Sequence, residues 1–144
     1  MSASGIKAIT YPAFYPLFLT LGVGLTGAFL TGDLFNLFVF SELLVISGAA
    51  LTAVSDDRYG PEAAYKYFYM SLLAGTSLLL AVGSLYVSYG TLNMADLALV
   101  LPNVAASPGL LVSALLFLAA FGIKAAFFPV FFWLPASYHT APFA

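Results

Sequence analysis

Apolar residues occur along this sequence in long runs that short polar stretches interrupt. A helix needs about 20 mainly apolar residues to cross a membrane, and four segments reach that length. The polar stretches "TGD" and "SDDRYGPE" separate two pairs of them, whereas the connection "GTLNMADLALVLPNVAAS" is mildly apolar and typical of a membrane interface. The pattern predicts membrane spans at approximately 12–30, 34–54, 63–89 and 108–140.

Composition points to the same class. Of 144 residues, 62% are hydrophobic and 7% are charged, whereas a soluble domain carries about a quarter charged residues. This small number of charges cannot cover the surface of a soluble globule. Lipid must therefore solvate most of the chain. We therefore predict an all-α, polytopic membrane bundle, formed as a single domain over residues 1–144. The N-terminus lacks the layout of a signal peptide, and no basic cluster suited to nucleic acid is present.

Basic residues predict the orientation of this bundle. In a four-span arrangement Lys7, Arg58 and Lys66 fall on one side, whereas the opposite loops contain no Lys or Arg. Loops rich in Lys and Arg stay in the cytoplasm. The N-terminus is therefore expected to be cytoplasmic.

The last span has an unusual pattern. It is longer than one crossing requires and contains Pro129 and Pro135. Proline removes a backbone hydrogen bond and clashes with the preceding turn, so "AAFFPVFFWLP" predicts a helix broken at Pro129. Broken backbone at membrane depth survives only beside protein or a water-filled cavity, and such breaks mark transport sites. The alternative is a simple kink, as is common in membrane helices.

Glu42 lies about eight residues, or roughly 12 Å, into its predicted helix. A carboxylate at that depth is costly and is expected to pair with another group. Its own helix offers only apolar neighbours on the same face, so a partner must come from another helix. Two interpretations remain: a protonated acid that makes one structural hydrogen bond, or a site that exchanges protons or pairs with a cation.

Lys124 precedes the predicted break, in "FGIKAAFFP". If the helix ends near Phe128, Lys124 lies close to a membrane surface and extends its ammonium group towards water. If a second half-helix follows Pro129, Lys124 lies near mid-membrane, at the depth of Glu42. A Glu–Lys pair whose spacing can change would be a sensible proton switch.

Other polar residues allow two readings each. Lys66 lies three residues into its span and is either an interfacial lysine or a functional one. His139 is the only histidine, either interfacial or a relay group, because imidazole ordinarily titrates near neutrality. Asp33 is predicted to cap the second span, and Asp96 a short interfacial helix. With no cysteine and one histidine, the sequence predicts no metal site, no cofactor and no covalent catalysis.

Three stretches together resemble a known family. They are "LTGDLFNLFVFSELLVISGAALTA", "AAYKYFYMSLLAGTSLLL" and "FGIKAAFFPVFFWLPASYHTAP". Their order and spacing resemble the large antiporter-like membrane subunits of Mrp-type Na⁺/H⁺ antiporters, respiratory complex I and membrane hydrogenases. The stretch "TGDLFNLFVF" is most similar to D-type antiporter subunits.

The resemblance implies roles for four residues. Glu42 matches the acid of the family's fifth helix, and Lys124 matches the lysine of its discontinuous seventh helix. Lys66 matches the lysine that opens the sixth helix, and His139 a histidine that follows "WLP". Ala136 departs from the family, because an acid is frequent at that position. Family subunits have roughly fourteen helices in two inverted repeats, so this chain corresponds to part of one repeat.

The leading hypothesis is a subunit, or a piece of one, of a Na⁺/H⁺ antiporter rather than an enzyme. Its expected partners are other membrane subunits, lipid, protons and monovalent cations, and its expected location is the cell membrane. A second hypothesis is a proton-pumping subunit of a complex I-like oxidoreductase or a membrane hydrogenase. A third is a helical scaffold in such a complex that carries no ions.

Overall fold

The structure of the protein, a computed structural model, describes residues 10–54, 59–104 and 107–140. The regular structure in these ranges is helical, apart from one isolated β-bridge, which confirms the predicted all-α class. The helices are α2 (Phe14–Leu30), α3 (Leu34–Ala53), α4 (Gly60–Tyr89), α5 (Met94–Val100), the 3₁₀ helix η1 (Leu101–Asn103), α6 (Pro108–Lys124) and α7 (Trp133–Thr140).

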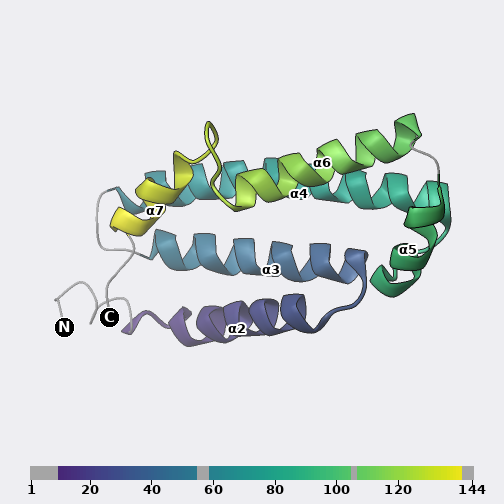
Figure 1. Cartoon of the computed structure of the whole chain (residues 1–144). Helices are drawn as coiled ribbons and strands as arrows, with labels where there is room; N and C mark the ends of the chain where they lie inside the picture. Colours follow the sequence, from purple (N-terminus) through teal and green to yellow (C-terminus); the bar gives the residue numbers. More distant parts are fainter. Residues whose placement is uncertain (1–9, 55–58, 105–106, 141–144) are drawn as a thin grey trace.

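The long helices α2, α3, α4 and α6 are roughly aligned, and each runs antiparallel to the next one in the chain (Figure 1). Helix α4 is central, because α3, α6 and α7 all pack against it, and α2 packs against α3. Helix α7 lies at the same end of the bundle as the start of α4, whereas α5 lies at the opposite end (Figure 1). The bundle thus has two distinct ends.

Glycine lets α2 and α3 approach closely. A Cβ atom at Gly27 would lie 2.6 Å from Cζ of Phe40, and one at Gly24 would lie 3.0 Å from Cγ of Leu44. Membrane helices commonly use small residues in this way, because lipid provides no hydrophobic drive for association and packing must supply it. Between α4 and α6 the hydroxyls of Ser84 and Ser113 form a 2.5 Å hydrogen bond.

Two matching turns close the end of the bundle that carries α5. The hydroxyl of Thr31 accepts from the amide of Asp33, and that of Thr91 accepts from the amide of Asn93, both at 3.2 Å. Asp33 and Asn93 form an antiparallel bridge with each other, and each caps the helix that follows it. Amides in the first turns of both helices, which have no partner within the helix, are thereby satisfied.

These turns settle the two capping predictions. Asp33 caps α3 as predicted, because its Oδ1 accepts from the amide of Asn36 at 2.9 Å. The prediction for Asp96 is wrong: Asn93 caps α5, and Asp96 lies in its first turn. The physical reason is that a cap must precede the first helical residue, and the helix already begins at Met94.

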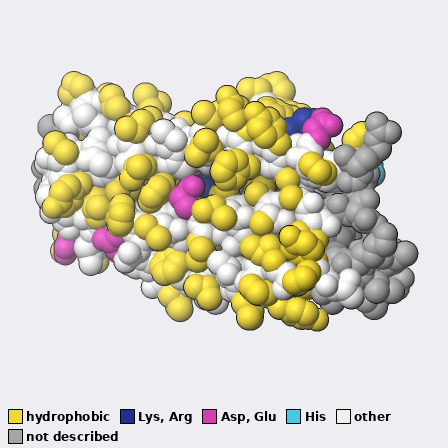
Figure 2. Space-filling view, turned by 180° about the vertical axis from the view of Figure 1, so that it is seen from behind, with side chains coloured by type: hydrophobic (Ala, Val, Ile, Leu, Met, Phe, Trp, Pro, Cys, Tyr) yellow, Lys and Arg dark blue, Asp and Glu magenta, His cyan; other side chains and the backbone are white. Residues whose placement is uncertain are grey.

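The outer surface is strongly apolar. Leucine, phenylalanine and valine side chains are exposed along all the long helices. Figure 2 shows hydrophobic side chains spread over one face, with acidic groups at both ends and one further acidic group near the middle, beside a basic one. Helices α3 and α4 are long and apolar enough to cross a membrane, whereas α2 and α6 are shorter apolar helices. The four crossings stay a prediction. Two of the residues used for orientation, Lys7 and Arg58, lie outside the described residues.

The last predicted span is divided into two helices. Helix α6 ends at Lys124 and α7 begins at Trp133, with irregular backbone between them that contains Pro129. In a continuous helix the proline ring would clash with the carbonyl four residues earlier, at Ala125, so the helix stops one residue before that point. Ala126 then adopts a left-handed conformation, with φ of 54°. A second half-helix therefore does follow Pro129.

Candidate functional site at the broken helix

Glu42 lies in the middle of α3, on the side that faces α4. A Cβ atom at Gly75 of α4 would lie 2.9 Å from Cδ and 3.2 Å from Oε2 of Glu42, so the carboxyl group rests directly on the α4 backbone. Its Oε1 is buried and has no hydrogen-bond partner among the described residues. A buried polar atom left without a partner is costly and usually indicates water, an ion or a functional role.

Lys124 is the last residue of α6 and is half-buried. Its ammonium group interacts electrostatically with the carboxylate of Glu42. In the described part of the chain, however, the salt bridge that forms is that of Lys66 with Glu62, so Glu42 and Lys124 are close but not joined. Lys124 also lies in the last turn of α6. Backbone carbonyls there have no partner within the helix, and their partial negative charge favours a cation.

A cavity of about 190 Å³ adjoins Lys124. It is lined by Ser41, Leu44, Val45, Tyr67, Ser71, Lys124 and Trp133. Three of these residues carry hydroxyl groups and one carries an ammonium group, and the space has room for several water molecules. The two residues that flank the irregular backbone, Lys124 and Trp133, thus line a cavity that contains polar groups, and irregular backbone at membrane depth requires protein or a water-filled cavity beside it.

Trp133 fixes the far side of the break. Its indole Nε1 donates to the carbonyl of Ile123 at 3.0 Å, and its ring centroid lies 5.3 Å from that of Tyr67. The first residue of α7 is thereby attached both to the last turn of α6 and to α4. This attachment holds Lys124 in place although no continuous helix follows it.

Tyr67 was not singled out from the sequence. It lies on the face of α4 that also carries Ser71 and Gly75, at spacings of four and eight residues, and it interacts electrostatically with Glu42. With Trp133 it also lines a neighbouring cavity of about 280 Å³ that includes Gly48 and Ser137. The Tyr-Ser-Gly spacing on one face of an apolar helix was the available signal, since small and polar residues there mark a helix contact.

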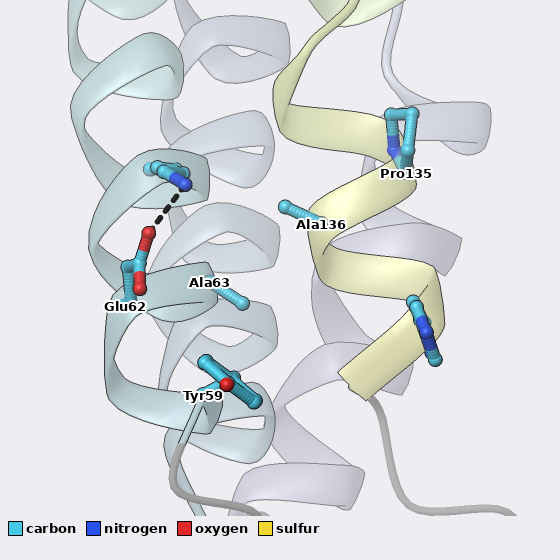
Figure 3. A pocket seen from close by; sticks show the side chains of 7 residues that line it. Tyr59, Glu62, Ala63, Pro135 and Ala136 are labelled. Atoms are coloured by element: carbon cyan, nitrogen blue, oxygen red, sulfur yellow. Dashed lines mark hydrogen bonds and ion pairs between the residues drawn. The ribbon is translucent and has the colours of Figure 1, made fainter.

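Lys66 and His139 lie in a different place. They line a cavity of about 480 Å³ near the start of α4, together with Tyr59, Glu62, Ala63, Pro135 and Ala136. Figure 3 shows Glu62 and Ala63 on α4 across from Ala136 on α7. The Lys66 ammonium is 2.5 Å from Oε1 of Glu62, and both side chains are partly exposed. The structure therefore brings the four predicted residues together as two pairs, one at the helix break and one at the end of the bundle.

Together these features define a class: a bundle of apolar helices with a discontinuous helix, a lysine at its break, and a central acid that interacts electrostatically with that lysine. Residues 31–144 match the family described as NADH:quinone oxidoreductase/Mrp antiporter, transmembrane. The chain belongs to this family, which confirms the resemblance seen in the sequence.

Relatives in the family come from both branches named above. The chain is 41% identical over 131 residues to the D-type subunit of a Na⁺/H⁺ antiporter from Alkalihalophilus pseudofirmus, covering 91% of this chain and 27% of the relative. It is 43% identical over 130 residues to the N-type subunit of an NADH-quinone oxidoreductase from Desulforudis audaxviator, covering 90% and 26%. The chain thus spans about a quarter of the length of the curated relatives it matches.

Solved structures share the fold. A chain of an archaeal membrane-bound sulfane sulfur reductase matches with a TM-score of 0.83 at 35% identity, covering 94% of this chain and 29% of that one. A chain of the Mrp complex from Dietzia sp. matches with a TM-score of 0.77 at 37% identity, covering 89% and 24%. Both are chains of multisubunit complexes.

Proposed function

We propose that the chain forms part of a cation/proton antiporter subunit and that Glu42 and Lys124 are its proton-translocating pair. The observation that supports this most directly is the arrangement at the break: a carboxyl group with one unpartnered, buried oxygen faces a lysine that does not reach it as a salt bridge. A merely structural acid would have its hydrogen bonds satisfied.

The chemistry follows from Coulomb attraction. An ionised Glu42 is drawn towards the ammonium of Lys124, whereas a protonated Glu42 is not. When the two side chains approach each other to about 4 Å, unit charges interact by about 4 kcal/mol at an effective dielectric constant of about 20, enough to couple a proton on Glu42 to the position of either side chain. The cavity beside Lys124 supplies hydroxyl groups and room for water through which a proton can reach the pair.

Lys66 and His139 are proposed to extend this path to the end of the bundle. They share a cavity, and the neighbouring cavity bounded by Tyr67, Trp133 and Ser137 lies along the same side of α4 and α7. We place this end in the cytoplasm and the bundle in the cell membrane, with other membrane subunits completing the transporter. Its transported cation is monovalent, as the names of the antiporter relatives suggest.

The test uses everted vesicles that contain the complete complex. Addition of Na⁺ or K⁺ should dissipate an imposed pH gradient with the natural chain, and Glu42→Gln or Lys124→Met should abolish this exchange. Asp96→Asn, which changes a carboxylate remote from the break, is the matched control and should retain it. Natural exchange rates in both Glu42→Gln and Lys124→Met would refute the proposal.

A second function is supported by the oxidoreductase relatives. In that case the same pair would move protons in a complex driven by electron transfer on partner subunits. Purification of the tagged chain with its partners in mild detergent separates the two. Co-purifying iron–sulfur proteins, together with vesicles that show no cation-dependent exchange, would favour the redox-driven pump.

A further inference from the structure

Helices α3 and α4 contact each other through two reciprocal pairs, each a polar side chain lying over a glycine. Glu42 of α3 rests on Gly75 of α4, and Tyr67 of α4 rests on Gly48 of α3, where a Cβ atom would lie 3.1 Å from the tyrosine hydroxyl. The two polar groups at the helix break are therefore both placed by glycines on the opposite helix.

Gly75 has no other evident reason to be glycine. It is buried inside the 30-residue helix α4, where glycine is about 1 kcal/mol less favourable than alanine. A Cβ atom added at Gly83 in the same helix would have nothing within 4 Å. Packing therefore does not require glycine at Gly83, and Gly75 differs from it in this respect. At Gly75 the space that a side chain would fill is taken by the carboxyl group of Glu42.

We propose that Gly75 is a positioning residue that forms a notch for the carboxyl group of Glu42 and so sets its separation from Lys124. The inference rests on the proposed function, because the separation matters only if the pair exchanges protons. The charged and titratable groups that interact with Glu42 are Lys124 at the end of α6 and Tyr67 on α4. The notch holds the carboxyl group against α4, and a side chain at this position would move it out.

Two compensating substitutions, which enlarge residue 75 and shorten residue 42, test the notch. Gly75→Ala should lower the exchange rate in everted vesicles by about tenfold or more, because small displacements of reacting groups have large effects on rate. Glu42→Asp shortens the acid by one methylene group and should also lower the rate. In the double variant the shorter acid fits beside the added methyl group, so its exchange rate should exceed that of Gly75→Ala alone by about tenfold.

Gly83→Ala is the matched control, since it adds the same methyl group to α4 in open space, and its rate should stay within about twofold of natural. A Gly75→Ala chain that exchanges at the natural rate would overturn the proposal. So would a loss that Glu42→Asp does not repair. If Gly75→Ala fails to accumulate, it is combined with Glu42→Ala: accumulation of that double variant supports the contact, and failure to accumulate overturns it.

Thermal unfolding of the purified complex separates failure of this inference from failure of the proposed function. If Glu42→Gln and Lys124→Met both leave exchange intact, the proposed function is wrong whatever Gly75 does. The notch itself is then judged from unfolding midpoints: the midpoint of Gly75→Ala should lie below that of Gly83→Ala, which has the same gain in helix propensity, and Glu42→Asp should restore part of the difference. Additive midpoints would show that the two residues do not meet.

Discussion

At the scale of single residues, the site depends on a few polar groups that α4 places opposite α3 and α6. Tyr67 is the clearest of those that the sequence did not identify, because it borders both the cavity beside Lys124 and the cavity towards Ser137. Its hydroxyl group lies over Gly48 and its ring packs on Trp133. One side chain thus has both a packing role and a polar one.

Tyr67→Phe separates these roles, since it removes the hydroxyl group and keeps the ring. We expect the amount of assembled protein to stay natural and the exchange rate to fall by about twofold to tenfold, the effect of one lost hydrogen-bonding group. Tyr65→Phe is the control, because Tyr65 is on the same helix but is 68% exposed on the outer surface. Equal rates in the two variants would exclude a role for the Tyr67 hydroxyl group.

At the scale of elements, the interruption between α6 and α7 and the paired turns before α3 and α5 decide where the helices begin and end. Pro129 excludes a continuous helix, and Trp133 then reattaches α7 to the end of α6. At the other end of the bundle, Asp33 and Asn93 each cap a helix and bridge to each other. Proline stereochemistry and helix capping therefore determine where the helices around Glu42 begin and end.

The caps give a prediction for stability. Asn93→Ala removes the acceptor for the amides of Ala95 and Asp96 and should destabilise the protein by about 1 kcal/mol. Asp96→Ala, in the first turn of the same helix, removes no cap and should cost less. The measurement is the thermal unfolding midpoint of the purified complex, and a larger shift for Asp96→Ala would contradict the assignment of the cap.

At the scale of the whole molecule, an apolar exterior surrounds an interior that is also mostly apolar, with a few polar side chains among its buried residues. Lipid or neighbouring subunits must cover the exposed leucine and phenylalanine side chains, because water would not. The two ends of the bundle differ, since α7 and the start of α4 lie at one end and α5 at the other (Figure 1). The orientation of the bundle therefore decides which side of the membrane the proposed proton path reaches.

This orientation can be measured with single cysteines, because the natural chain contains none. We expect a membrane-impermeant maleimide to label Leu99→Cys on α5 in intact cells, and Tyr11→Cys just before α2 only after permeabilisation. Both side chains are exposed, and α5 and the start of α2 lie at opposite ends of the bundle (Figure 1), where the two membrane surfaces are expected, so labelling reports the side of the membrane. The reverse result would place the N-terminal end outside, and labelling of both in intact cells would contradict the up-and-down arrangement.

The sequence by itself determined the class of protein, the helical composition and the interruption of the last span. These features follow from hydrophobic content and from the stereochemistry of proline, both of which act locally. The cap at Asp33 was predictable for the same reason, whereas Asp96 was assigned wrongly because the start of α5 is fixed by Asn93, three residues earlier. The central position of Glu42 in its helix also followed from counting residues.

The tertiary structure alone decided which groups meet. The sequence required a partner for Glu42 from another helix but gave no register between α3, α4 and α6, and that register sets Glu42 against Gly75 and near Lys124. It also separated Lys66 and His139 from this pair. Contacts between helices depend on how whole faces pack, and an apolar exterior leaves little pattern in the sequence to show which face points inward.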